Sequence, residues 1–166
     1  ALGSAQLKAM TSAQLNALDQ SQLQAIDSTD LNALSTATVA SLTSAQLNNF
    51  SSKQIAGLNA VQVKALTSTQ LNNLSTSLLQ AIEAADLAAI ATHVINALTT
   101  TQAALLSTAQ MTGLSSSQIG AMTTDQVHSL STTQIKALTS NQIKALSSVQ
   151  LNNLQAAQLA LLDAAS

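Results

Sequence analysis

An eight-residue pattern repeats twenty times, without insertion or deletion, from Gly3 to Leu162. The octads follow the frame [S/T/D/N]-x-x-Q-[L/I/V]-x-[small]-[L/M/I], of which residues 139–146 are a clean copy. The eighth position is apolar in all twenty octads, and the fifth is a large apolar residue in nineteen, Ala103 being the exception. A short, uniform period of this kind indicates a repeat architecture in which each unit buries its apolar residues against its neighbours.

The spacing of the apolar residues selects a helix, but not a continuous one. Positions five and eight are three residues apart, so they share one face of a helix and would lie on opposite faces of a strand. Ala, Leu and Gln are abundant and Pro is absent, which also favours helix. In one unbroken helix, eight residues advance about 80° beyond two full turns, so the apolar stripe would wind around the rod. We therefore expect the helix to break once in every octad.

Position one predicts where each helix begins. Sixteen octads carry Ser, Thr, Asp or Asn at this position, and all four are preferred N-cap residues. Gln follows three residues later in fifteen octads, which completes a capping box. Because so short a helix is unstable alone, it must stack on its neighbours. The sequence thus predicts an all-α solenoid, a superhelical coil of about twenty short capped helices that forms one domain over residues 1–166.

The remaining positions are assigned by residue size and polarity. Position seven is mostly small, which lets one helix approach the next, and positions two, three and six are expected on the outside. The rule lapses between Thr76 and Leu98, where the helix is expected to run on through the breaks. In this stretch, position one holds Glu83 and Ala91, and Leu78 and Val94 replace Gln. Either the octads here are degenerate and more deeply buried, or these four residues mark a bend or a contact patch for another chain.

Charge and composition exclude several classes of partner. Only 7% of the residues are charged, and the net charge is −2 with five Lys and no Arg. This argues against nucleic acid, whose binding depends on neutralising phosphates. The chain has no Cys for disulfides or thiolate metal sites. Its apolar runs are far shorter than the roughly 20 residues that cross a bilayer, so no membrane insertion is expected.

The ionisable residues follow the helix dipole and form no evident catalytic site. All acids fall in the first half of an octad, and four of the five Lys stand at position six, near the expected helix C-termini. His93 and His128 are far apart at different octad positions, with no further ligands converging on them, so no metal or other cofactor is expected. No His is placed to activate a Ser nucleophile. We therefore expect a protein that is not an enzyme.

Uninterrupted octads of the form L-[S/T]-x-x-Q-[I/V/L]-x-[A/N] resemble low-charge repeat regions in large bacterial secreted or surface proteins. This resemblance covers the whole chain and implies a bacterial origin, export, and an extracellular or cell-surface location. It also implies a structural role as a spacer, stalk or surface array. The chain begins at Ala1, and residues 163–166 read as the start of a further octad, so we expect a segment of a longer array.

Three other functions are compatible with the sequence. An adhesive module would bind a protein or glycan through outward Asn and Thr, with the pairs at 48–49, 72–73 and 152–153 as candidates. A flat, uncharged Thr- and Ala-rich face would suit ice binding. Apolar ends without capping repeats would allow end-to-end self-association into a filament. The variable residue types at position six argue against the adhesive module.

Overall fold

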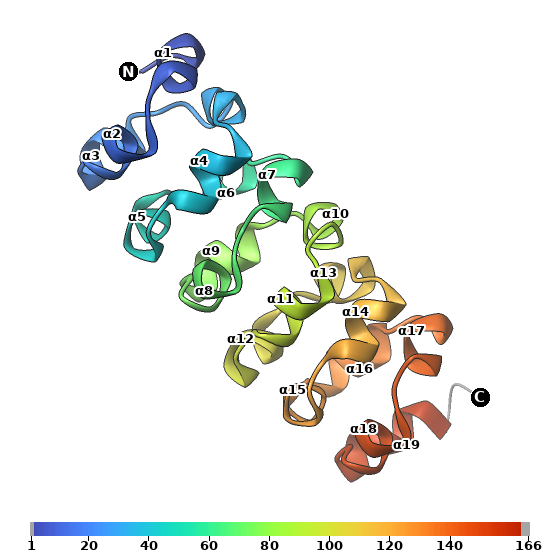
Figure 1. Ribbon diagram of the computed structural model, residues 1–166. Helices are drawn as coiled ribbons and strands as arrows, with labels where there is room; N and C mark the ends of the chain where they lie inside the picture. Colours follow the sequence, from blue (N-terminus) through green and yellow to red (C-terminus); the bar gives the residue numbers. More distant parts are fainter. Residues whose placement is uncertain (1, 164–166) are drawn as a thin grey trace.

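The computed structural model describes residues 2–163, and over these residues it contains nineteen α-helices and one 3₁₀ helix, η1. The helices wind as one elongated coil from the N-terminus to the C-terminus (Figure 1), which confirms the predicted all-α solenoid. The octads are numbered 1 to 20, octad 1 beginning at residue 3, and each contains one helix. The helices are α1 Ser4–Ala9, α2 Ser12–Asn16, α3 Gln20–Gln24, η1 Asp30–Ala33, α4 Thr36–Ser41, α5 Ser44–Asn49, α6 Ser52–Ala56, α7 Ala60–Lys64, α8 Ser68–Asn72, α9 Thr76–Ala81, α10 Ala84–Leu87, α11 Thr92–Asn96, α12 Thr100–Leu105, α13 Thr108–Gly113, α14 Ser116–Ala121, α15 Thr124–Ser129, α16 Thr132–Ala137, α17 Ser140–Lys144, α18 Ser148–Asn152 and α19 Ala156–Asp163.

The predicted breaks and caps are confirmed in most octads. Between α15 and α16, Leu130 (φ −63°, ψ 141°) and Ser131 (φ −70°, ψ 159°) are both extended, and these two residues separate the helices. The Ser131 hydroxyl accepts a hydrogen bond from the Gln134 backbone N–H at 3.1 Å, and the Gln134 side chain accepts one from the Ser131 N–H at 2.7 Å. The same reciprocal box caps the helices of octads 2, 3, 6–9 and 13–19.

Two kinds of contact set the size of the superhelical turn. The helices that pack most extensively are three octads apart, as α10 is from α7 and from α13. Side-chain hydrogen bonds reach further, since Gln118 of octad 15 donates to the carbonyl of Ile90 in octad 11, 28 residues earlier. One turn of the coil therefore contains between three and four octads.

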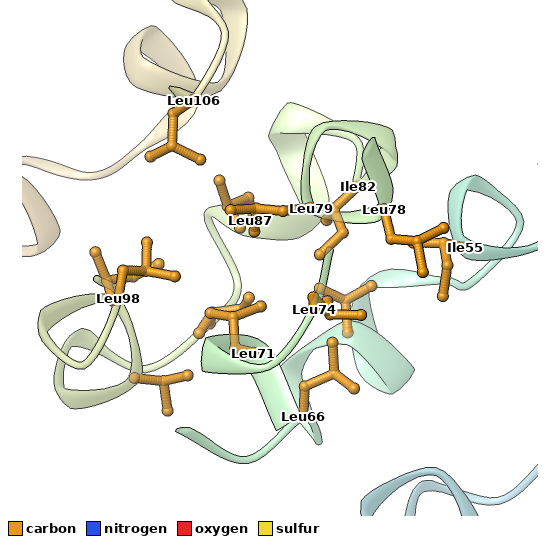
Figure 2. Packing of buried hydrophobic residues seen from close by; sticks show 14 of the residues in the cluster. Ile55, Leu66, Leu71, Leu74, Leu78, Leu79, Ile82, Leu87, Leu98 and Leu106 are labelled. Carbon is orange, nitrogen blue, oxygen red and sulfur yellow. The ribbon is translucent and has the colours of Figure 1, made fainter. Parts of the chain in front are cut away.

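Positions five and eight form a single apolar core along the coil (Figure 2). Position-five side chains such as Leu71 and Leu79 have no exposed surface, and position-eight side chains such as Leu74 are about 4% exposed. The expected clearance at position seven is also confirmed. A Cβ atom on Gly57 would lie 2.9 Å from the carbonyl oxygen of Ser28, so the two backbones are already in contact there.

The expectation that the helix runs on between Thr76 and Leu98 is wrong. α9, α10 and α11 are separate, and Glu83 (φ −62°, ψ 144°) and Ala91 (φ −64°, ψ 145°) are extended although neither side chain caps a helix. The preceding residues, Ile82 and Ile90, are only 2% and 3% exposed. The break persists because the position-eight side chain must enter the core, and a continuous helix would carry it away from the core.

Octad 4 also departs from the expected α-helix. The Asp27 carboxylate accepts hydrogen bonds from the backbone N–H and the hydroxyl of Thr29, both at 3.2 Å, which holds the first residues in a local turn. Asp30 stands where Gln would complete the capping box, and it instead accepts from the backbone N–H (3.1 Å) and the hydroxyl of Ser4 at the start of α1. Only the short 3₁₀ helix η1 forms here.

Candidate functional site

Gln side chains at position four link consecutive turns of the coil. We call the linking set the glutamine ladder. Its members belong to octads 6–9 and 13–20, and all of them are at most 8% exposed. Sequence reasoning assigned these residues to capping alone. The ladder consists of Gln46, Gln54, Gln62, Gln70, Gln102, Gln110, Gln118, Gln126, Gln134, Gln142, Gln150 and Gln158.

Gln54 shows how both ends of the amide are used. Its Oε1 accepts a hydrogen bond from the backbone N–H of Ser51 at 2.9 Å, which completes the capping box of its own octad. Its Nε2 donates to the carbonyls of Leu23 and Ile26, at 2.7 Å and 2.8 Å, four octads earlier. The last carbonyls of a helix lack partners within that helix. One side chain therefore satisfies the start of its own helix and the end of a helix in the preceding turn.

The ladder requires an amide and excludes a carboxylate. Glu and Gln serve equally as the third residue of a capping box, yet position four holds Gln in fifteen octads and Glu in none. A carboxylate could accept from the N-cap N–H but could not donate to the carbonyls behind it. The absence of Glu was thus the sequence signal for the ladder.

Position six supplies a second set of links, in the opposite direction along the chain. Gln80 Nε2 donates to the Leu105 carbonyl at 2.7 Å, and Asn96 Nδ2 donates to the Ala121 carbonyl at 2.6 Å, each 25 residues later. His128 Nδ1 makes the corresponding contact with the Asn153 carbonyl at 2.6 Å. Gln80, Asn96 and His128 are exposed, as expected of position six, and each also bonds the next turn of the coil.

The four candidate partner-contact residues do not share one exposed patch. Leu78 and Val94 are each 4% exposed and belong to the core, and Figure 2 shows Leu78 beside Ile55 of α6. Glu83 and Ala91 are exposed at the uncapped starts of α10 and α11. Contact of this stretch with another chain stays a prediction, and only the two N-cap residues are accessible for it.

The Asn pairs proposed for adhesion are partly engaged within the coil. Asn48 donates to the Asn73 carbonyl at 2.7 Å and accepts from the Ser75 backbone N–H at 2.8 Å. Asn73 and Asn153 each donate to a carbonyl of their own helix, at 2.8 Å and 2.9 Å. Position three is the row that is exposed in every octad, and it mixes Ala, Ser, Thr, Lys, Val, His, Asp and Asn.

Three acidic groups have shifted pKa values, each for a local reason. The Ser21 hydroxyl, followed by the backbone N–H of Gln22, lowers the pKa of Asp19. The backbone N–H and then the hydroxyl of Thr29 lower the pKa of Asp27. Asp86 is different, because partial burial raises its pKa and the neighbouring Glu83 carboxylate raises it further.

The described surface has open hollows and scattered apolar side chains. Among residues 2–163, no three His, Asp or Glu side chains gather as a metal site would require. Both His93 and His128 are exposed. An open hollow of about 280 Å³ lies over Asp27, Ser51 and Lys53, and another of about 390 Å³ lies over Leu2, Leu18, Gln22 and Ala25. Exposed large apolar residues such as Val61 and Val149 are far apart in the sequence.

No helix in the described part of the chain is long and apolar enough to span a membrane.

A family model described as the ALTTAQ repeat matches five overlapping segments, residues 23–59, 46–76, 79–116, 104–132 and 114–148, which together cover more than half of the chain. No curated protein and no solved structure shows a significant match to the sequence.

Proposed function

Since the chain belongs to the ALTTAQ repeat family and is a structural repeat protein, we propose that it is a stiff, nearly uncharged spacer or surface-array segment of an exported bacterial protein. In this role its length is set by the number of octads, and no side chain performs chemistry. Repeat proteins of this kind are extended in one dimension, and each unit contacts only its near neighbours.

The glutamine ladder is the observation that carries this proposal. Gln110, for example, bonds the carbonyls of Leu79 and Ile82 at 2.9 Å each, so that rotation of one turn against the next would break two buried hydrogen bonds. A typical intramolecular hydrogen bond contributes about 0.5–1.5 kcal/mol, and leaving a buried group unpaired costs about 1–3 kcal/mol. Repeated along the coil, these links resist bending and twisting.

Low charge suits a spacer better than a binding module. Seven acids and five Lys are spread over 166 residues, which gives little electrostatic attraction toward a charged partner. The exposed row at position three has no uniform residue type. Glycan adhesion, ice binding and end-to-end assembly therefore have less support than a geometric role.

Distance measurements between two spin labels test the stiffness. The chain has no Cys, so labels can be attached to A45C and T133C, at exposed position-three sites eleven octads apart. We expect one narrow distance distribution, and a broad one would contradict a stiff spacer. The matched control carries the same labels with Gln110→Leu, Gln118→Leu and Gln126→Leu, and we expect its distribution to widen.

Export requires a separate test in the organism that encodes the chain. Protease treatment of intact cells, followed by detection with an antibody against the repeat, should remove the signal while an internal marker protein survives. Protection of the repeat on intact cells would contradict a surface location and leave the stiffness result unaffected.

A further inference from the structure

One turn of the coil lacks the glutamine ladder. Octads 10, 11 and 12 hold Leu78, Asp86 and Val94 at position four, so none of them can donate to the carbonyls of octads 6–8 as Gln would. The neighbouring carbonyls on either side do receive such bonds, Leu42 from Gln70 and Leu74 from Gln102. Because three to four octads complete a turn, these three cover most of one turn of contact. We call the contact between octads 10–12 and octads 6–8 the unlinked turn.

The same three octads also lack their helix caps. Ser75, Glu83 and Ala91 make no side-chain cap hydrogen bond, and α10 is the shortest α-helix of the described chain at four residues. At the starts of α9, α10 and α11 the third helical N–H donates only to the N-cap carbonyl, at 2.9–3.1 Å, so these helices lack the side-chain acceptors that the capping boxes of octads 13–19 provide. Weak helix starts and missing links coincide in one place.

The replacing side chains restore only part of what the ladder provides. Leu78 and Val94 are buried in the core and add apolar contact, which is non-directional and does not fix the turns against sliding. Asp86 is half-buried, and among the described residues its carboxylate has no hydrogen-bond or ion-pair partner, although its backbone is bonded within the helix. As a carboxylate it can only accept, so it cannot bond the carbonyls that face position four.

One polar bridge still crosses the unlinked turn. Asn48 of octad 6 donates to the Asn73 carbonyl and accepts from the Ser75 N–H, at 2.7 Å and 2.8 Å. The glutamine ladder is intact on both sides of the unlinked turn, toward the N-terminus and toward the C-terminus. Gln70 links octad 9 to octad 5, and Gln118 links octad 15 to octad 11. Two linked blocks thus meet at a contact with a single polar pivot.

From these observations we propose that the unlinked turn is the yield point of the coil. It opens by local unfolding before any turn held by the ladder, and the blocks on either side then move about Asn48 and octad 9. This behaviour would give a stiff segment one defined place at which it extends or bends under load. The inference depends on the distribution of links and holds whether or not the chain is exported.

Amide hydrogen exchange on the full chain tests the proposal, because exchange reports the free energy of local opening. We expect amides of α9–α11 to exchange about tenfold or more faster than those of α13–α15, a ratio that corresponds to about 1.4 kcal/mol. Equal protection in the two regions would overturn the proposal without any variant being needed.

Two variants test whether the missing Gln links cause the fast exchange. The repaired variant, Leu78→Gln with Asp86→Gln and Val94→Gln, rebuilds the ladder and should raise protection of α9–α11 to the level of α13–α15. The transplanted variant adds Gln110→Leu, Gln118→Asp and Gln126→Val to the repaired chain and should move the fastest exchange from α9–α11 to α13–α15, the helices of octads 14–16. If the fastest amides stay in α9–α11 in both variants, the missing links are not the cause and the proposal fails.

Discussion

The linked turn of octads 13–17 and the unlinked turn of octads 10–12 have the same apolar core and differ in polar bonding. Position-five residues are fully buried in both, as Leu87 and Ile119 show. In the linked turn each helix has a capping box and a Gln bonded to the preceding turn, whereas octads 10–12 have neither. The apolar pattern is therefore enough to place a helix in the coil, and polar bonds decide how firmly its turns are held.

Truncating a buried position-five side chain should lower the free energy of unfolding more than any other change considered, and by the same amount in the two regions. Ile55→Ala lies at the unlinked turn and Ile119→Ala in a linked one, and the parent side chains are 2% and 0% exposed. Each substitution removes buried methyl groups and leaves a cavity, so we expect each to lower the free energy of unfolding by about 2–5 kcal/mol. Urea denaturation followed by circular dichroism measures both. A much smaller cost for Ile55→Ala would mean that the core, and not only the ladder, is loose at the unlinked turn.

Gln118→Glu should be the next most harmful change. Glu keeps the acceptor for the Ser115 N–H but replaces the donor to the Leu87 and Ile90 carbonyls with a buried negative charge. We expect a loss of about 2–3 kcal/mol in the free energy of unfolding at neutral pH. Gln14→Glu is the matched control, since Gln14 is exposed and bonds only within its own capping box. If Gln14→Glu were as costly, the requirement for Gln would lie in the cap and not in the ladder.

Loss of a cap should matter only where the cap bond exists. The Ser115 hydroxyl accepts from the Gln118 N–H at 3.2 Å, so Ser115→Ala should cost about 1 kcal/mol of unfolding free energy. Ser75 makes no cap bond, and Ser75→Ala should change stability very little. Equal costs in chemical denaturation would contradict the contrast between the two regions.

The smallest expected effect is the change with pH in the free energy of unfolding that is due to Asp86. Because its pKa in the folded chain is raised above the ordinary 3.8, the folded state holds this proton more tightly than the unfolded state. The resulting stability is present below about pH 4 and is lost as pH rises through the raised pKa. Of the helices packed against α10, α7 ends at Lys64 and α13 carries no charged residue, while the Glu83 carboxylate directly before α10 opposes ionisation of Asp86.

Asp86→Asn should therefore gain stability over the natural chain on going from pH 4 to pH 7. The measurement is the difference in unfolding free energy between the two chains across this range. The lowered pKa values of Asp19 and Asp27 act in the opposite direction, with stability lost as pH falls, but they are common to both chains and cancel. A difference that stays constant with pH would show that the Asp86 charge does not affect folding.

Much of this arrangement could be predicted from single octads. The caps at position one, the core at positions five and eight, and the clearance at Gly57 all depend on groups whose roles are visible within eight residues or on the size of one side chain. The continuous helix expected near Glu83 and Ala91 was wrong because missing caps were taken to mean a missing break. Packing of Ile82 and Ile90 enforces the break without a cap.

In most octads the repeating unit follows from the sequence alone: where the helix begins, where it ends, and which apolar residues are buried. These features follow from hydrogen bonds and apolar spacing within one octad, and so they can be read locally. The winding of the coil, by contrast, sets the three to four octads in each turn. It also brings Gln at position four and the amides at position six against the neighbouring turns, and leaves octads 10–12 unlinked. The bonds between turns join residues 25 to 31 positions apart, as from Gln54 to Leu23. Which carbonyl meets which amide depends on how the whole coil winds.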